Sequence, residues 1–286
     1  MNSEISFIKM HGLGNDFVII DARLDEDNTR FSLQKREKIC DRHFGVGCDQ
    51  LILLKKPNDS DNAHIRMEIF NANGEETTAC GNAARCVAWL LLHHNDFYTP
   101  SAGSIFIETE KGVLEAFPKT SKSIEISLLE PKFDWESIPL SKALKTDQLA
   151  FPKFQDLIGK GFAVNIGNSH LVFFVKDLKK IDIEQIGAHL EIRKIFPEKT
   201  NVEFAQIVSD KDIEMKVWER GCGQTLACGT GAAAVTIAAI KKGLIKETAN
   251  VHMPGGKLKI HWKEHNPVRI SGSVDLIFEG KLDLSF

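Results

Sequence analysis

The chain repeats itself at a distance close to half its length, and this repeat limits the possible fold more than any other feature. Segments 65–92 (IRMEIFNANGEETTACGNAARCVAWLLL) and 213–240 (IEMKVWERGCGQTLACGTGAAAVTIAAI) align at an offset of 148 residues. The offset places Met67 on Met215 and Cys80 on Cys228. Self-similarity at a fixed spacing is typical of duplicated structural units. We therefore expect two related halves.

Two shorter matches occur in the same order and favour the same interpretation. Gly14-Asn15, followed by FVII, aligns with Gly167-Asn168, followed after two residues by LVFF, at an offset of 153 residues. A looser match pairs DQLI at 49–52 with TNVE at 200–203. The simplest alternative is a general likeness between strand-then-helix segments. Three matches in one order favour duplication instead.

The pattern of apolar residues predicts an α/β (α+β) fold of two pseudosymmetric halves. Segments 83–92 and 232–240 are apolar on nearly every face, apart from Arg85 and Thr236, and such helices are buried. Amphipathic helices are expected at 33–42 and 183–195, with short strands between them. Each half is expected to wrap a curved, mainly antiparallel sheet around its own central helix. The expected domains are 1–122, joined by a returning strand at 274–286, and 123–273.

Composition and charge exclude several classes of protein. Of the 286 residues, 43% are hydrophobic and 26% are charged, which is typical of a soluble globular protein. The net charge is -3 and no basic stripe occurs, so no nucleic-acid partner is expected. The first residues, MNSEISFIKMHG, contain neither a positively charged run nor an apolar run of the kind found in secretory signals. We expect a cytoplasmic protein with no membrane partner.

Two of the six cysteines are distinguished by the repeat. No C-x-x-C pair and no zinc-like Cys/His spacing occurs, so free thiols are expected, with no metal and no disulfide. Cys80 and Cys228 are equivalent, and each directly precedes a buried helix. The cysteines without such an equivalent are interpreted as packing residues: Cys40, Cys48, Cys86 and Cys222.

A cysteine at a helix start suits proton transfer beside a carboxylate. The helix dipole and the unpaired N–H groups are expected to lower the thiol pKa toward neutrality. The N–H groups of Gly81-Asn82 and Gly229-Thr230 can cradle a carboxylate. Racemisation or epimerisation needs two equivalent groups on opposite faces of one carbon. One thiolate would remove the α-proton while the other thiol donates a proton. No cofactor is expected.

A series of motifs, in order along nearly the whole chain, resembles the diaminopimelate epimerase family. The motifs are HGLGNDFV, FNANG, ACGNAARC, GNSH, TNVEF and ERGCGQTLACGTGA. The resemblance implies a pseudosymmetric two-domain fold and no cofactor. It also implies interconversion of LL- and meso-diaminopimelate on the route to lysine and peptidoglycan. A small amino-acid substrate is thus expected, and a homodimer is the expected assembly.

The same resemblance implies roles for individual residues. Cys80 and Cys228 would be the acid-base pair. The reacting carboxylate would be held by Gly81, Asn82, Gly229 and Thr230. Further substrate-binding residues would be Asn15, Gln50, Asn71, Asn168, Asn201, Glu219 and Arg220. His170 and Glu219 would tune the thiols. Four residues depart from the family motifs GNPH, CGNG, FNADG and ERGxGET, namely Ser169, Ala83, Asn73 and Gln224.

Broken symmetry within the repeat gives an independent hint about the substrate. Asn71 and Glu219 both stand nine residues before their cysteine, yet only Glu219 is charged and followed by an arginine. We expect the distal carboxylate of a substrate with two amino-acid ends to meet Arg220. The distal ammonium would meet Glu219 or its backbone. The alternative is an ordinary surface ion pair between the two side chains.

Two other functions remain open. One is a proline racemase-like or phenazine-pathway-like isomerase on the same fold. The other is a non-catalytic thiol redox or ligand-binding protein, because two thiols across a cleft could join in a disulfide.

Overall fold

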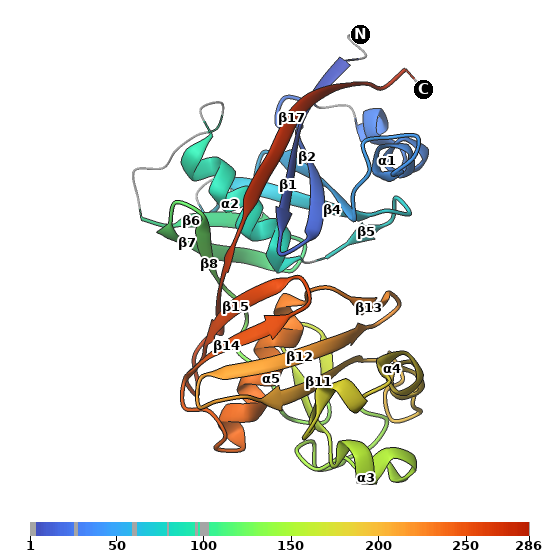
Figure 1. Ribbon diagram of the computed structural model, residues 1–286. Coiled ribbons are helices and arrows are strands. Elements are labelled where there is room, and N and C mark those ends of the chain that lie inside the picture. The colour runs from blue at the N-terminus through green and yellow to red at the C-terminus, as the bar shows by residue number, and fades with distance from the viewer. Residues whose placement is uncertain are drawn as a thin grey trace. The chain divides into compact units, whose positions relative to one another are not determined.

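The computed structural model describes residues 4–25, 28–58, 62–78, 80–94, 97 and 103–285, and the chain divides into two compact units (Figure 1). Unit 1 comprises Met1–Ile126 and Gly272–Phe286, and unit 2 comprises Ser127–Ser271. Unit 2 is therefore continuous in sequence, whereas unit 1 is built from both ends of the chain. The domain limits expected from the sequence, 1–122 with 274–286 and 123–273, remain a prediction.

Unit 1 is a mainly antiparallel sheet with two α-helices. Its elements are β1 (Glu4–Gly12), β2 (Asn15–Asp21), η1 (Asn28–Phe31), α1 (Leu33–Cys40), β3 (Gln50–Lys55), β4 (Ile65–Asn71), β5 (Glu76–Thr77), α2 (Gly81–His93), β6 (Ile105–Thr109), β7 (Gly112–Thr120), β8 (Ser123–Ser127) and β17 (Asp275–Asp283). The pairs β2–β3 and β4–β6 are parallel. The pairs β1–β2, β3–β4, β4–β5, β6–β7 and β7–β8 are antiparallel.

Unit 2 repeats this order of pairing. Its elements are η2 (Pro152–Phe154), α3 (Gln155–Ile158), β9 (Phe162–Asn165), β10 (Ser169–Phe174), η3 (Leu178–Lys180), α4 (Ile183–Glu191), β11 (Asn201–Ile207), β12 (Asp212–Glu219), β13 (Gly223–Thr225), α5 (Gly229–Lys241), β14 (Thr248–Met253), β15 (Gly256–His261) and β16 (Arg269–Ser273). The pairs β10–β11 and β12–β14 are parallel, as their counterparts are in unit 1. The other pairs, β9–β10, β11–β12, β12–β13, β14–β15 and β15–β16, are antiparallel. The predicted fold of two pseudosymmetric halves is confirmed.

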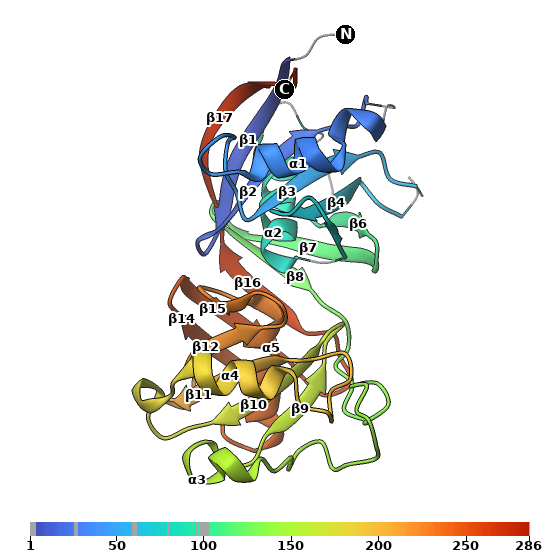
Figure 2. The ribbon, with the colours of Figure 1, turned by 90° about the vertical axis from the view of Figure 1, so that its right-hand side faces the viewer.

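Each unit encloses its own central helix, as the apolar segments predict. Helix α2 packs against β1, β6 and β7, and α5 packs against β9, β10, β11, β14 and β15 (Figures 1 and 2). Both helices are buried along most of their length, including the two polar exceptions Arg85 and Thr236. Both begin at the glycine that follows the cysteine, a little earlier than the apolar pattern alone predicts.

The two amphipathic helices are shorter than their sequence pattern. Helix α1 ends at Cys40 because the Asp41 carboxylate accepts the N–H groups of His43 and Phe44, which turns the chain. Helix α4 ends at Glu191, and a turn follows in which the Arg193 N–H donates to the Leu190 carbonyl. Both helices pack on the outside of their sheets, α1 against β3 and α4 against β11 and β12.

The last strand belongs to unit 1. Strand β17 pairs antiparallel with β1, from Glu4 opposite Asp283 to His11 opposite Asp275. Phe286, at the end of the predicted strand, and Ala79, in the first ACG motif, lie outside the described residues. None of the helices in the described ranges has the length and apolar character that crossing a membrane would require.

Candidate active site

Cys80 and Cys228 are the N-cap residues of the two buried helices. Both have extended backbone angles, with φ -147° and ψ 109° at Cys80 and φ -130° and ψ 115° at Cys228. The Cys80 Sγ accepts the N–H of Ala83 at 3.5 Å, and the Cys228 Sγ accepts the N–H of Gly231 at 3.4 Å. Each sulfur thus takes the place of the hydroxyl or carboxylate oxygen of a usual N-cap. The helix start also presents N–H groups that lack intrahelical partners.

A strand of the same unit packs beside the glycine after each cysteine, and the approach is close only at Gly81. A Cβ at Gly81 would lie 3.0 Å from Ile126 Cδ1, and one at Gly229 would lie 3.9 Å from Ile270 Cδ1. Ile126 is in β8 and Ile270 is in β16, the equivalent strands of the two units. The first position of each helix is therefore a small residue whose N–H is available to an anion.

In unit 1, Asn15 lies beside the cysteine helix. Its Oδ1 accepts a hydrogen bond from the Asn82 Nδ2 at 3.2 Å and lies 3.7 Å from the Cys80 Sγ. Its Nδ2 donates to the Asp49 Oδ2 at 3.1 Å. The turn between β1 and β2 is thereby fixed against the start of α2. Asn15, Cys80 and Asn82, predicted separately, form one cluster.

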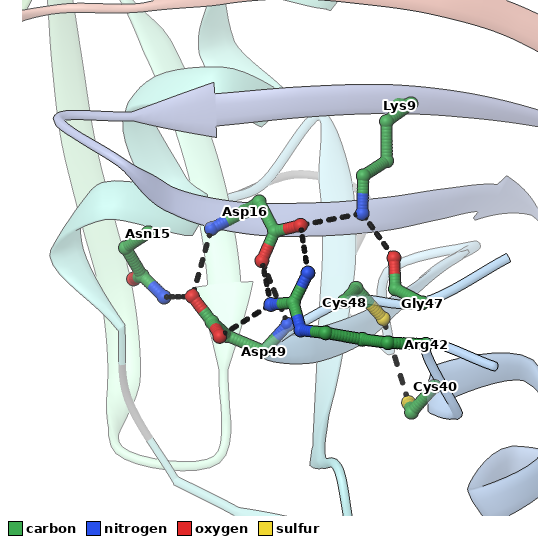
Figure 3. Close-up of polar contacts among 8 residues, drawn as sticks. All are labelled: Lys9, Asn15, Asp16, Cys40, Arg42, Gly47, Cys48 and Asp49. Carbon is green, nitrogen blue, oxygen red and sulfur yellow. Dashed lines mark hydrogen bonds and ion pairs between the residues drawn. The ribbon is translucent and has the colours of Figure 1, made fainter.

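A network of charges holds Asn15 and Asp49 in place (Figure 3). Arg42 donates to Asp16 at 2.6 Å and to Asp49 at 2.7 Å. Lys9, which is buried, donates to Asp16 at 2.7 Å and to the carbonyl of Gly47. Burial opposes ionisation of Asp16, but the hydrogen bonds from Arg42 and Lys9 hold its pKa well below the usual range. Asp16 therefore stays ionised at neutral pH, and the network keeps Asn15 oriented.

Gln50 and Asn71 lie opposite each other on β3 and β4. The Gln50 Nε2 donates to the Asn71 Oδ1 at 3.0 Å. Within the described residues, the Gln50 Oε1 is buried without a hydrogen-bond partner. A buried amide oxygen that lacks a partner is costly unless a ligand supplies a donor. An ammonium group would be such a donor.

In unit 2 a hydrogen-bond chain leads from a buried carboxylate to Cys228. The Glu203 Oε1 lies 2.7 Å from the His170 Nδ1, and the His170 Nε2 lies 2.8 Å from the Asn168 Oδ1. The Asn168 Nδ2 donates to the Thr230 Oγ1 at 3.5 Å, and that oxygen lies 3.5 Å from the Cys228 Sγ. The predicted residues His170, Asn168, Thr230 and Cys228 are thus connected.

The predicted lowering of the thiol pKa is wrong for Cys228. Burial raises the pKa of Cys228 well above its ordinary value, and the nearby carboxylates of Glu219 and Glu203 add to this. The hydrogen bonds from Thr230 and from the Gly231 N–H oppose the shift but do not overcome it. Burial also raises the pKa of Glu203, against the lowering effect of His170. Desolvation outweighs the helix start here.

Asn201, Glu219 and Arg220 lie together at the ends of β11 and β12. The Asn201 Nδ2 donates to the Ser169 carbonyl at 2.8 Å, and its Oδ1 accepts the Arg220 N–H at 3.0 Å. The Glu219 carboxylate accepts the hydroxyl of Thr225. The exposed Arg220 guanidinium donates to the Glu198 carbonyl at 3.0 Å. Asn201 therefore positions the backbone of Arg220, and its contact with substrate remains a prediction.

The four departures from the family motifs fit their surroundings. The buried Ser169 forms a hydrogen bond with the Thr200 hydroxyl at 2.9 Å, and Ala83 donates its N–H to the capping Cys80 Sγ. The Asn73 Oδ1 accepts the Glu75 N–H at 3.2 Å and supports the turn before β5. Gln224 is exposed on β13.

The remaining cysteines are free, but one of them is not a packing residue. Cys40, Cys48 and Cys86 are buried, and Cys40 and Cys48 contact each other with 3.5 Å between their sulfurs. Cys222 is exposed, because it lies in the turn between β12 and β13. Its interpretation as a packing residue is wrong.

Sequence reasoning missed several residues that support the site. Glu203 lies within the TNVEF motif, where only Asn201 was singled out. Asp16 directly follows Asn15, and Asp49 directly precedes Gln50. An acidic residue beside each predicted site amide was the signal that could have identified them. Arg85 was visible as the one charge on an otherwise apolar helix.

Solved structures define the class of fold. A phenazine biosynthesis protein of the PhzF family from Bacillus anthracis is similar with a TM-score of 0.69 and 15% identity, covering 98% of this chain and 99% of that one. A hydroxyproline epimerase from Agrobacterium vitis, with bound trans-4-OH-L-proline, is similar with a TM-score of 0.68 and 14% identity, covering 99% and 93%. The chain thus has the duplicated α/β fold, with a buried helix in each half, that these structures share.

Sequence relatives identify the family within that fold. The family model "Diaminopimelate epimerase" matches residues 7–126 and 162–276. The diaminopimelate epimerase of Sphingopyxis alaskensis is 42% identical over 277 residues, 97% of each chain. That of Carboxydothermus hydrogenoformans is 38% identical over 281 residues, covering 97% of this chain and 99% of the relative. The chain belongs to the diaminopimelate epimerase family and is an isomerase. The alternative functions are not favoured.

Proposed function

We propose that the chain interconverts LL- and meso-diaminopimelate with Cys80 and Cys228 as the two acid-base groups. The observation that carries the proposal is the equivalence of the two thiols. Each caps a buried helix and accepts a backbone N–H three residues further on. The names of the relatives, which cover nearly the whole chain, supply the substrate.

One thiolate removes the α-proton, and the other thiol delivers a proton to the opposite face of the same carbon. The roles exchange in the reverse direction. Negative charge develops on the reacting carboxylate as the proton leaves. The N–H groups of Gly81-Asn82 and Gly229-Thr230 stabilise that charge, and preorganised donors of this kind supply a large share of catalysis. The protein's own side chains suffice for this proton transfer, so the proposal requires no cofactor.

The distal end of the substrate is held by groups that only unit 2 has. Arg220 binds the distal carboxylate, since a guanidinium matches a carboxylate with two parallel donors. Glu219 or its backbone receives the distal ammonium. Asn15, Gln50, Asn71, Asn168 and Asn201 complete the polar lining, and His170 orients Asn168. The buried Oε1 of Gln50, which has no partner within the described residues, fits an ammonium donor.

The proposal extends to the setting of the enzyme. Lysine biosynthesis, and the peptidoglycan precursor route, follow from the substrate. A cytoplasmic location is proposed, in keeping with the free thiols of the described cysteines. A homodimer is proposed for its assembly, and sedimentation of the purified protein tests that directly.

Deuterium incorporation tests the reaction and the mechanism together. Reduced enzyme is incubated with LL-diaminopimelate in D₂O, and both isomers are isolated early in the reaction. The product should carry deuterium at the α-carbon, while the remaining substrate stays mostly unlabelled, because separate groups abstract and donate. L-proline serves as the control substrate and should exchange no α-proton.

Three outcomes would contradict the proposal. Exchange with proline but not with diaminopimelate would favour a proline racemase-like enzyme. If the reduced, folded protein exchanged neither substrate, a non-catalytic thiol protein would be the better description. Labelling of substrate as fast as product would instead indicate a single base.

A further inference from the structure

Arg85 is a fully buried cation in the helix that Cys80 caps. Its side chain is 0% exposed, and it lies in the second turn of α2. Side chains of a helix lean toward its N-terminus, so the guanidinium is directed back toward the cysteine end. The positive end of the helix dipole lies there too, which makes the position doubly unfavourable for a cation.

The guanidinium is connected to the site through Asn82. The Arg85 Nη2 donates to the Asn82 Oδ1 at 2.6 Å, and the Asn82 Nδ2 donates to the Asn15 Oδ1 at 3.2 Å. Gly12 makes room for this arrangement, because a Cβ there would lie 3.4 Å from the Arg85 Nη2 and 3.3 Å from the Asn82 Cβ. Arg85 therefore fixes the rotamer of a side chain next to the capping sulfur.

The charge of Arg85 has no carboxylate against it among the described residues. No ion pair involves Arg85 there, and its buried Nε and Nη1 have no hydrogen-bond partner. Burial lowers the pKa of Arg85, whereas the thiols of Cys86 and Cys80 raise it. Burial raises the pKa of Cys86 well above the ordinary value, so that thiol stays neutral. Cys80 is therefore the neighbouring thiol that can balance the positive charge of Arg85, by ionising to a thiolate.

Other ionisable groups of unit 1 near α2 include paired carboxylates and one histidine. On the β1–β2 side, Asp16 and Asp49 are engaged by Lys9 and Arg42. Strand β1 also contributes His11, and β17 contributes Asp275, whose charge acts on Cys86. Asp275 pairs with Lys122 at 3.4 Å, and the His11 Nδ1 is buried without a hydrogen-bond partner among the described residues. Strands β6 and β7 bury apolar side chains toward the helix, namely Ile105, Ile107 and Ala116.

We propose that Arg85 is a positioning residue that holds Asn82 and keeps negative charge favourable at the Cys80 end of α2. The proposal rests on the proposed function in that it takes Cys80 as an acid-base group. The charge of Arg85 favours the Cys80 thiolate and also the reacting carboxylate beside Gly81-Asn82. The equivalent of Arg85 in unit 2 is Ala233, so only one of the two thiols has this support.

The pH dependence of Cys80 alkylation tests the proposal without relying on turnover. Intact protein is treated with iodoacetamide at a series of pH values, and the peptide containing Cys80 is quantified by mass spectrometry. In the wild-type chain the midpoint should lie below the ordinary thiol value of about 8.5. Arg85→Met, which keeps the volume and removes the charge, should raise the midpoint by about one pH unit. Arg85→Lys should restore most of the shift.

Arg36→Met is the matched control. Arg36, another arginine of unit 1, is partly buried and donates to the carbonyls of Phe31 and Gly74, away from Cys80. Its loss should destabilise the fold and leave the alkylation midpoint of Cys80 unchanged. If Arg85→Met does not fold, the wild-type midpoint and the Arg85→Lys variant still decide.

Two results would overturn the proposal. One is a wild-type midpoint at or above that of an ordinary thiol. The other is a folded Arg85→Met variant whose midpoint rises no more than that of Arg36→Met, or a folded Arg85→Lys variant whose midpoint rises by a full pH unit although the charge is kept. Failure of the proposed function would look different, since Cys80→Ser would then retain activity whatever the alkylation midpoint is.

Discussion

The two units share one arrangement of strands but bury different charges. In unit 2, His170 on β10 and Glu203 on β11 form a buried polar pair. The equivalent positions in unit 1, Phe17 on β2 and Ile52 on β3, are apolar. Where α2 of unit 1 has Arg85, α5 of unit 2 has alanine. The cation Arg85 thus lies near Cys80, whereas the carboxylates of Glu219 and Glu203 lie near Cys228.

This difference shows how a duplicated fold can acquire two unequal groups. The capping geometry depends on the backbone and on a small residue after each cysteine, and both units keep it. The charge around each sulfur depends on one or two core side chains, and these have diverged. Two thiols in equivalent positions can therefore differ in their preferred protonation state without any change in the fold.

The largest expected effect is the loss of either thiol. Cys80→Ser and Cys228→Ser should each lower epimerisation in both directions by about 10³-fold or more, because a hydroxyl is a far weaker acid than a thiol and each direction uses both groups. Residual α-proton exchange, followed by NMR in D₂O, should favour opposite isomers in the two variants. Cys222→Ser, at the exposed cysteine, is the control. Near wild-type rates in either site variant would rule out the assigned pair.

Removing the charge that only unit 2 carries should have the next largest effect. Arg220→Ala should lose about 2–4 kcal/mol in kcat/KM for diaminopimelate, because a charge-assisted contact to the distal carboxylate disappears. The equivalent position in unit 1 is Ala72, so the unit 1 side cannot compensate. Arg193→Ala, an exposed arginine of the same unit, controls for loss of surface charge. Unchanged kinetics would show that Arg220 is an ordinary surface residue that does not bind the substrate.

The buried carboxylate of unit 2 should make a smaller, pH-dependent contribution to stability. Because the folded-state pKa of Glu203 is raised, the folded state binds its proton more tightly than the unfolded state does. The contribution of Glu203 should be most favourable below the ordinary glutamate pKa and should fall as pH rises through the raised value. Urea unfolding of wild-type and Glu203→Gln proteins across that window measures it. A stability difference that does not change with pH would contradict the burial of a titrating Glu203.

The smallest expected effect has the opposite sign. Hydrogen bonds from His252, Ser209 and Asn250 lower the pKa of the half-buried Asp212 from 3.8 to about 2. Its contribution should be present above the ordinary value and should be lost as pH falls toward 2. Asp212→Asn should therefore remove part of the acid sensitivity of unfolding. If the variant showed the same acid profile as wild type, these hydrogen bonds would contribute nothing in solution.

Much of the fold was predictable because it depends on local patterns of residues in the sequence. The repeat predicted equal halves, the all-round apolar segments predicted the buried helices, and the Cys-Gly pairs predicted their starts. The helix lengths were overestimated at Cys40 and Glu191, where turns end the helices despite a continuing amphipathic pattern. A turn of this kind depends on individual hydrogen bonds to backbone N–H groups, which the spacing of hydrophobic residues does not predict.

The electrostatics were less predictable because they depend on burial and on contacts distant in sequence. The contact between Asn15 and Asp49 spans 34 residues and exists because β2 and β3 pair in parallel. The raised pKa of Cys228 results from full burial, which sequence cannot quantify at a helix start. Glu203 was part of a visible motif, but nothing in the motif says that the carboxylate is buried against His170.

The return of the last strand to the first unit affects how the chain is made. Strand β1 precedes unit 2 along the chain and its partner β17 follows it, so one edge of β1 stays unpaired until β17 has been synthesised. Unit 2 is continuous and can close on the ribosome before unit 1 does. An open edge invites pairing with other chains, so truncation before β17 should yield nascent protein that aggregates and depends on chaperones.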